Sequence, residues 1–326
     1  MKIRFLCTIR KMLDHTLTKR KVLTLCEFSR QYAYDRRKDG EKLYEGRCGS
    51  VLGMVKHLEA FGGNDIPLER VDVDTCKRFT EYLRAANDQH HHIKKTKKLS
   101  DSTIRLKLNI LKSVLKEAVR QGLLEKDPFE KLPITHRTKA QQKERAALTK
   151  EELKKLNETP CDTPLLKEAF MLSCMTGLRK SDILSLSAQD IQKCNNTYYI
   201  YKKIKKTQRW IKLPLPEAAY HIINKLQTEN KNASRLFANL SANHLNRNLR
   251  AWVQIGGIEG KHITFHCARH TCATLLLTQG TDIYTIMKYL GHQSINTTQR
   301  YAHITEKKLA NAASLLSYDL TAAIAC

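Results

Sequence analysis

The sequence predicts a mostly α-helical protein of two domains, the second of which also carries a small antiparallel β-sheet. Three observations support this prediction. Apolar residues recur every three or four positions over much of the chain, a polar and basic stretch interrupts the pattern near residue 140, and one later segment is rich in β-branched and aromatic residues. With 326 residues, 41% of them hydrophobic, the chain is long enough to bury roughly two cores.

The first domain, residues 1–135, is predicted to contain four helices. The clearest of them begins after Ser100, a candidate N-cap, and ends before Gly122. One face of this helix carries the apolar residues Ile104, Leu108, Leu111, Leu115 and Ala118. Similar spacing predicts three further helices, over residues 22–36, 51–61 and 73–85.

Residues 136–147 are predicted to form an interdomain linker, because they are polar, basic and nearly free of large apolar side chains. The second domain, residues 148–326, opens with Thr149 and Glu152, which have the spacing of a helix capping box. Helical signals then continue to Gly177, which is expected to end a helix.

A β-hairpin is predicted between Thr197 and Leu213. Two runs of strand-forming residues, TYYIYKKIKK and RWIKLPL, stand on either side of Thr207-Gln208. From Ile191 to Lys212 there are seven Lys or Arg residues and no Asp or Glu. The hairpin is therefore either a surface that contacts DNA or simply a solvated basic one. After it, the chain is predicted to be helical until near its end.

The charge of the chain indicates a polyanionic partner. Lys and Arg total 57 against 32 Asp and Glu, a formal net charge of +25, and nucleic acid is the usual partner of so basic a protein. No apolar run approaches the ~18 residues of a membrane span, and the opening segment lacks the features of a signal peptide. We therefore expect a soluble, cytoplasmic protein without a membrane partner.

The ten cysteines form no CxxC pair, so we expect reduced and mostly buried thiols. A cluster of His262, His266, Cys267, His270 and Cys272 leaves a zinc site as an alternative. The preferred prediction assigns no metal ligand.

Three stretches could carry chemistry: TGLRKSDIL (176–184), TFHCARHTCATLLL (264–277) and LGHQSINTTQRY (290–301). His266 and Arg269 lie three apart on a predicted helix, so both project from one face. Two guanidiniums can hold the oxygens of a phosphodiester and stabilise a pentacoordinate transition state. Tyr301 could attack the phosphorus once a base removes its proton. Each stretch alone is also compatible with ordinary packing or a surface pair.

Together, these stretches closely resemble the motifs of the tyrosine recombinase (lambda-integrase) family. TGLRKSDI resembles the first arginine box, HCAR the HxxR box, and LGHQSINTTQRYAHI the LGH segment. Tyr301 follows His292 by nine residues and His266 by 35, as in that family. In the first domain, LSDSTIRLKLNILKSVLKEAVRQGLLEKDPF is similar to a helix of integrases from Bacteroides-type mobile elements.

The resemblance implies a helical core-binding domain and a catalytic domain that clamp around duplex DNA. It implies that Tyr301 forms a 3′-phosphotyrosyl link while Arg179 and Arg269 hold the phosphate. By the same resemblance His266 assists proton transfer at the tyrosine and His292 hydrogen-bonds the phosphate.

Two further roles follow from the resemblance. Lys206 stands eight residues before Pro214 and corresponds to the general acid, although a shift in register would select a neighbouring lysine: Lys202, Lys203 or Lys205. Asp182 is expected to orient the site, with a surface acid or helix-cap group as the alternative. Contacts with DNA are expected from Lys94, Lys95, Lys97, Lys98, Arg105, Lys202, Lys203, Lys205 and Arg209.

The implied activity is integration, excision or inversion of a bacterial DNA element at specific double-stranded sites, without ATP, metal or another cofactor. The expected assembly is a homotetramer on DNA that exchanges C-terminal tails, with accessory DNA-bending or directionality factors as possible partners. The tail could instead fold back on its own domain. Many such integrases begin with an arm-binding domain, and because the segment before the first predicted helix is short, we expect none here. A type IB topoisomerase and a non-enzymatic DNA-binding regulator are the alternative functions.

Overall fold

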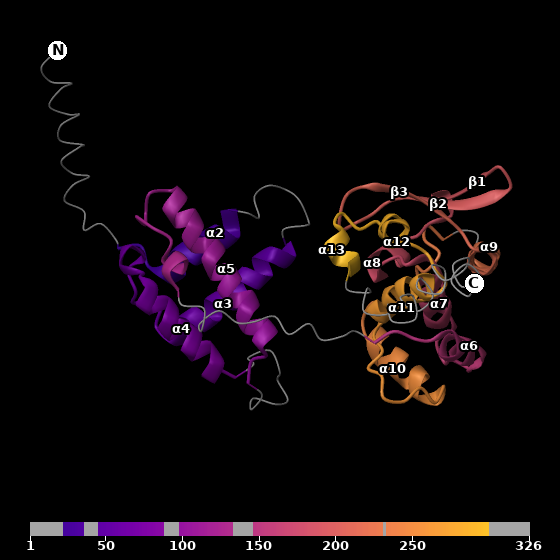
Figure 1. The fold of residues 1–326 in the computed structure, drawn as a ribbon, viewed down its shortest axis with the longest axis horizontal. Helices are drawn as coiled ribbons and strands as arrows, with labels where there is room; N and C mark the ends of the chain where they lie inside the picture. The colour runs from indigo at the N-terminus through magenta and orange to yellow at the C-terminus, as the bar shows by residue number, and fades with distance from the viewer. Residues whose placement is uncertain (1–21, 36–44, 88–97, 133–145, 231–232, 300–326) are drawn as a thin grey trace, which may run out of the picture. The chain divides into compact units, whose positions relative to one another are not determined.

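The computed structural model describes residues 22–35, 45–87, 98–132, 146–230 and 233–299 (Figure 1). The chain divides into two compact units, Met1–Lys143 and Glu144–Cys326. Within the described ranges, no helix combines the length and the apolar character that a membrane span needs.

The described part of the first unit contains four α-helices, which confirms the predicted four-helix architecture (Figure 1). They are α2 (Leu25–Asp35), α3 (Glu45–Phe61), α4 (Val73–Ala85) and α5 (Asp101–Arg120), with the short 3-10 helices η2 (Leu68–Arg70) and η3 (Pro128–Lys131) between and after them. Their apolar faces enclose one core, whose largest fully buried members are Leu25, Phe28, Met54, Leu58, Phe79, Leu83, Leu111 and Leu115.

Local signals in the sequence explain where α5 begins and ends. Ser100 is the N-cap, and its hydroxyl accepts a hydrogen bond from the backbone N–H of Thr103. Just beyond the helix, Gly122 adopts a left-handed conformation with φ of 72°. By contrast, α3 begins at Glu45, six residues before the predicted start at Val51. Two glycines weaken the helical signal in this added turn, whereas its Cys48 is buried in the core, a tertiary contact that favours the helix.

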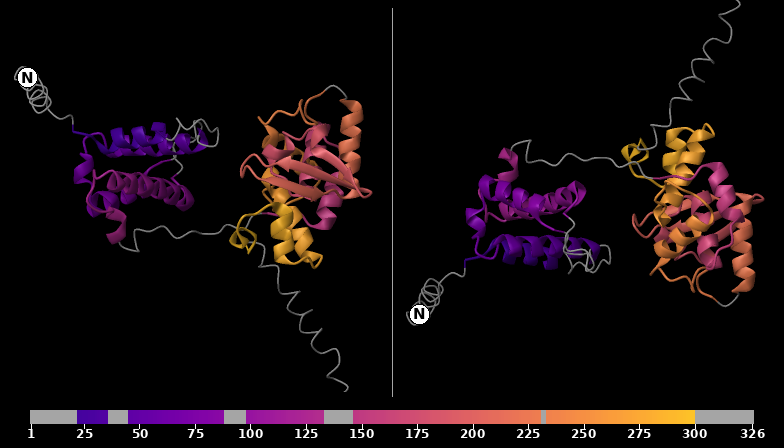
Figure 2. Two further views of the ribbon diagram at one scale, coloured as in Figure 1. Left: turned by 90° about the horizontal axis from the view of Figure 1, so that it is seen from above. Right: turned by 90° about the horizontal axis from the view of Figure 1, so that it is seen from below.

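The second unit combines helices with a three-stranded sheet, and the strands lie together on one side of it (Figure 2). Its α-helices are α6 (Lys150–Glu158), α7 (Pro164–Thr176), α8 (Lys180–Ile183), α9 (Glu217–Glu229), α10 (Leu245–Ile255), α11 (Phe265–Thr278), α12 (Ile283–Leu290) and α13 (Ile295–Thr298). The capping box of Thr149 and Glu152 is present at the start of α6, as predicted.

The core of this unit surrounds α7, which is buried on nearly all sides. The ring of Phe170 on α7 makes edge contacts with Trp252 of α10 and Phe265 of α11, at centroid distances of 6.1 and 5.8 Å. Gly177 ends α7 in a left-handed conformation, with φ of 66°, which confirms the predicted helix stop.

The predicted hairpin is confirmed as β2 (Thr197–Lys203) and β3 (Trp210–Pro214), paired antiparallel with Ile200 opposite Leu213. A further strand, β1 (Ile191–Cys194), pairs with the other edge of β2 and was not predicted. Its sequence, IQKC, has little strand character. The connecting turn contains Asn195 and Asn196, both with positive φ, so this dipeptide was the available signal for a hairpin.

Candidate active site

Arg269 connects the three motif-bearing stretches in the folded chain. It projects from α11 and is 4% exposed. Its Nη1 donates to the carbonyl of Gly177 at the end of α7, and its Nη2 donates to the carbonyl of Leu290 at the end of α12, both at 2.6 Å. Carbonyls at helix C-termini lack helical partners and carry partial negative charge, so a buried guanidinium satisfies both.

The two carbonyls that Arg269 binds are each two residues before another candidate. Arg179 follows Gly177 and is the N-cap residue of α8, where its side chain is partly exposed. Its side chain makes no capping hydrogen bond to the start of α8. His292 follows Leu290 in the same way. The packing of Arg269 therefore brings the chain segments of Arg179 and His292 to the same end of α11.

His292 is held by a residue that sequence reasoning missed. Its Nδ1 lies 2.8 Å from the hydroxyl of Thr298, which is fully buried on α13. Gly291, with φ of 62°, turns the backbone sharply after α12, and the N–H of His292 then caps the carbonyl of Met287. A threonine six residues after a histidine is not a recognisable sequence signal, because the contact depends on the turn between them.

His266 lies on α11 one turn before Arg269, with its side chain exposed. Its ring meets the ring of His270 at a centroid distance of 5.1 Å and an angle of 78°. His270 itself is 7% exposed. A solvent-facing imidazole on the same helix as the buried Arg269 is in a position to exchange protons with a bound substrate.

Lys206 occupies the turn between β2 and β3 and is exposed. The turn is closed by two backbone hydrogen bonds of 2.8 Å, from Ile204 N–H to the carbonyl of Arg209 and from Gln208 N–H to the carbonyl of Ile204. The side chains of Lys203, Lys205 and Arg209 are exposed as well. The tip of the hairpin thus presents several cations to solvent.

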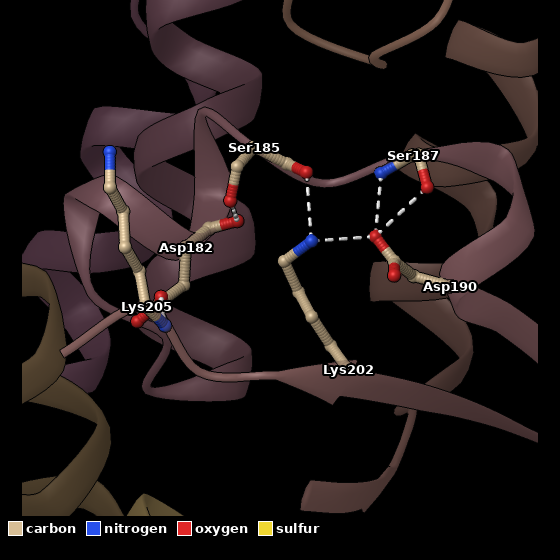
Figure 3. Close-up of polar contacts among 6 residues, drawn as sticks. All are labelled: Asp182, Ser185, Ser187, Asp190, Lys202 and Lys205. Atoms are coloured by element: carbon tan, nitrogen blue, oxygen red, sulfur yellow. Dashed lines mark hydrogen bonds and ion pairs between the residues drawn. The ribbon is translucent and has the colours of Figure 1, made fainter. Parts of the chain in front are cut away.

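Asp182 connects α8 to this hairpin (Figure 3). Its carboxylate is fully buried, and Oδ1 accepts the backbone N–H of Lys205 at 3.0 Å. Its other oxygen, Oδ2, has no hydrogen-bond partner among the described residues. Complete burial rules out the alternative of a surface acid. The contact fixes the backbone of the residue next to Lys206.

Lys202 differs from its neighbours and corrects one expectation. It is 8% exposed, and its ammonium donates to Asp190 Oδ2 at 2.7 Å and to the carbonyl of Ser185 at 2.8 Å (Figure 3). Asp190 also accepts hydrogen bonds from the backbone N–H and the hydroxyl of Ser187. Lys202 was expected to contact DNA, but its side chain points to the interior face of β2, where this ion pair holds it. It also cannot take the role assigned to Lys206 without leaving that pair.

The histidines and cysteines considered as zinc ligands have separate surroundings. His262 Nε2 lies 3.2 Å from Nη2 of Arg250, and Cys267 contacts Thr264 at the start of α11. Burial raises the pKa of Cys272 to about 12, which disfavours the thiolate that a metal requires. No group of three or more potential ligands converges within the described ranges. Of the eight cysteines described there, all are free and six are buried, as predicted.

Several candidates are not placed. Tyr301 and the basic residues Lys94, Lys95 and Lys97 lie outside the described residues, whose last range ends at Gln299. Lys98, next to this basic group, is exposed and pairs with Asn87 in an isolated β-bridge, and Arg105 is exposed on α5.

Comparison with known proteins identifies both units. Residues 146–308 match the model of the phage integrase family, and residues 24–138 match the phage integrase SAM-like domain. The tyrosine recombinase XerC of Bacillus subtilis (strain 168) is 30% identical over an alignment of 233 residues, and the alignment covers 66% of this chain and 74% of the relative.

Solved structures share the fold. A XerH site-specific recombinase bound to a palindromic difH substrate superposes with a TM-score of 0.64 at 18% identity, covering 91% of this chain and 96% of that one. A lambda integrase tetramer bound to a Holliday junction gives a TM-score of 0.64 at 20% identity, covering 89% and 80%. The family match spans the described site residues from Arg179 to His292. The chain therefore belongs to the phage integrase family and is a tyrosine-type site-specific recombinase.

Proposed function

We propose that this recombinase cuts and rejoins double-stranded DNA with Tyr301 as the nucleophile and Arg179, Arg269 and His292 around the scissile phosphate. The observation that carries this proposal is the position of Arg269, whose two hydrogen bonds hold the segments of Arg179 and His292 together. The family's reaction needs neither ATP nor a metal, because the energy of the phosphodiester is kept in the covalent intermediate.

In the proposed reaction, the phenolic oxygen of Tyr301 forms a bond to phosphorus as the bond from phosphorus to the 5′-oxygen breaks. The phenol loses its proton with the help of His266, and Lys206 gives a proton to the leaving 5′-oxygen. General acid catalysis of this kind contributes roughly 10²–10⁴-fold. Attack of a 5′-hydroxyl from the partner strand then reverses the chemistry and completes the exchange.

The buried contacts below the hairpin support the assignment of Lys206. Asp182 holds the N–H of Lys205, and Lys202 anchors the end of β2 to Asp190. Lys206 therefore stands in a turn whose neighbouring residues, Lys202 and Lys205, are both held by buried carboxylates. We propose that Asp182 is a positioning residue for Lys206: by holding the backbone of Lys205, it orients the proposed general acid.

We propose that the expected DNA contacts, apart from Lys202, neutralise phosphates on a duplex bound by both units. The exposed members in the described residues are Lys98, Arg105, Lys203, Lys205 and Arg209. The formal charge of +25 supports such a backbone contact, because released counterions drive the association.

We further propose that protomers assemble as a tetramer in which the segment after Tyr301 docks on a neighbouring subunit. The solved lambda integrase tetramer on a Holliday junction supports the four-protomer assembly. A truncation after Lys307 should still bind a single site but no longer form complexes with two sites on native gels. Normal two-site complexes from the truncated protein would contradict the tail exchange.

The decisive test of the proposed chemistry is Tyr301→Phe, which removes only the phenolic oxygen. We expect this variant to bind DNA with unchanged affinity and to form no denaturant-resistant adduct with it, because phosphate contacts supply most of the binding. Arg269→Lys provides a comparison in which the nucleophile is intact but the phosphate clamp is altered. An adduct formed by the phenylalanine variant would eliminate Tyr301 as nucleophile.

A further inference from the structure

An open cavity of about 490 Å³ lies between β3 and the segment from α12 to Gln293. Among its lining residues, the proposed function already uses His292 at the scissile phosphate and Arg209 as a contact with duplex DNA. Cations line it from both sides, Arg209 from the hairpin and Lys288 from α12, and none of the described lining residues is acidic. The volume is that of a small-molecule site, and its charge favours an anionic ligand.

One wall of the cavity is an exposed tryptophan. Trp210 is 59% exposed, although a large aromatic side chain is usually covered. Its ring is stacked on Tyr201 of the neighbouring strand, with centroids 4.8 Å apart and an angle of 15° between the planes. The register of β2 and β3 pairs Lys203 with Trp210 and Tyr201 with Lys212, so the two rings are diagonal neighbours on one face of the sheet.

The stacking holds Trp210 in one orientation while leaving much of the indole accessible. Stabilisation of the hairpin alone would not require the indole to stay accessible beside Arg209 and Lys288. An aromatic surface flanked by cations suits a ligand that has both a flat ring and a negative charge. A nucleotide has both, because its base stacks on aromatic rings and its phosphate pairs with Arg and Lys.

We infer that this cavity binds one unpaired nucleotide of the DNA substrate, with the base stacked on Trp210 and the phosphate near Arg209 and Lys288. The inference rests on the proposed function, since the ligand is part of the same DNA. A base inside a duplex has both faces covered by its neighbours, so only an unstacked base can reach the indole. Strand exchange itself produces such bases, because the released 5′ strand must leave its complement before it joins the partner strand.

The test compares two labelled duplexes of the same sequence, one fully paired and one with a single additional unpaired thymidine at its centre. Affinities of the full-length protein are measured by fluorescence anisotropy. We expect the unpaired nucleotide to increase affinity about 5- to 150-fold, the range for one base stacked on an aromatic side chain. Trp210→Ala should bring the ratio of the two affinities to about one, and Lys288→Gln should reduce it.

Two variants serve as controls. Tyr284→Ala removes an aromatic residue of α12 that is similarly exposed but does not line the cavity, so it should keep the preference. Trp210→Phe retains a ring and should keep most of it. If Trp210→Ala and Trp210→Phe both failed to bind the paired duplex as well as the duplex with the unpaired nucleotide, Trp210 would have a structural role and the inference would be wrong.

The outcomes separate this inference from the proposed function. Binding of neither duplex by the wild-type protein would contradict the function itself. Equal affinity for both duplexes, or a preference that survives in Trp210→Ala, would overturn the inference while leaving the function intact. A Trp210→Ala variant that kept the preference but no longer formed multi-protomer complexes would instead make the cavity a docking site for a second copy of the chain.

Discussion

Replacement of Lys202 tests whether the buried ion pair near the turn end of β2 stabilises the second unit. The Nζ of Lys202 lies 2.7 Å from Asp190 Oδ2, and the two side chains are only 10% and 17% exposed. Lys202→Met keeps much of the volume of the side chain and removes the charge. It leaves the carboxylate of Asp190 without a cation and the carbonyl of Ser185 without its donor.

We expect Lys202→Met to lower the free energy of unfolding by about 3 kcal/mol. Loss of one partner from a buried pair costs ~3–5 kcal/mol, because the remaining charge is left in a poorly solvated environment. The lower end of that range applies here because Asp190 still accepts two hydrogen bonds from Ser187. Lys203→Met, one residue further along the same strand, removes an exposed charge and should change stability by less than about 0.5 kcal/mol.

Tryptophan fluorescence during urea unfolding measures this change in the correct unit. The chain has two tryptophans, Trp210 and Trp252, and both belong to the unit Glu144–Cys326. The shift of the transition midpoint, multiplied by the slope of the transition, gives the change in the free energy of unfolding. The double variant Lys202→Met with Asp190→Asn should recover most of the loss, because no unpaired charge then remains.

Two results would refute this reasoning. One is a midpoint for Lys202→Met as close to wild type as that of Lys203→Met, which would mean that the ion pair does not hold the hairpin. The other is a double variant as unstable as the sum of its single variants, which would show that the two residues do not interact energetically.

Three other predictions follow from the site and its surroundings. Lys206→Ala should cleave normal DNA slowly, but its cleavage rate should recover when sulfur replaces the bridging 5′-oxygen, because a thiolate leaves without a proton. If sulfur instead rescued the alanine variant of a neighbouring lysine, that lysine would be the general acid. Gly177→Ala should lower the free energy of unfolding of the second unit by about 2 kcal/mol or more, because the φ of residue 177 is 66° and the new Cβ would overlap Leu290. A transition midpoint equal to that of wild type in the same fluorescence assay would contradict this prediction. At pH 8, iodoacetamide should modify the exposed Cys194 well before Cys272, because burial raises the pKa of Cys272 to about 12. Peptide mass spectrometry measures the two rates of modification, and equal rates would contradict the described burial.

Much of the fold could be predicted because its signals are local. The N-cap at Ser100, the capping box at Thr149 and the helix stop at Gly177 each depend on hydrogen bonds or backbone angles within a few residues. The start of α3 and strand β1 were missed for the opposite reason. Burial of Cys48 and pairing with β2 stabilise them, and neither effect is visible in a short window of sequence.

The types and spacing of Arg179, His266, Arg269 and His292 were enough to predict the family, because its motifs are short patterns that can be read along the chain. What each of these side chains contacts depends on the folded chain and could not be read in the same way. Lys202 is an anchor rather than a DNA contact because successive residues of a strand face opposite sides of the sheet, and packing selects which side is buried. The role of Arg269 as a buried link between two helix ends likewise depends on residues 92 and 21 positions away from it, which come together only when the core forms.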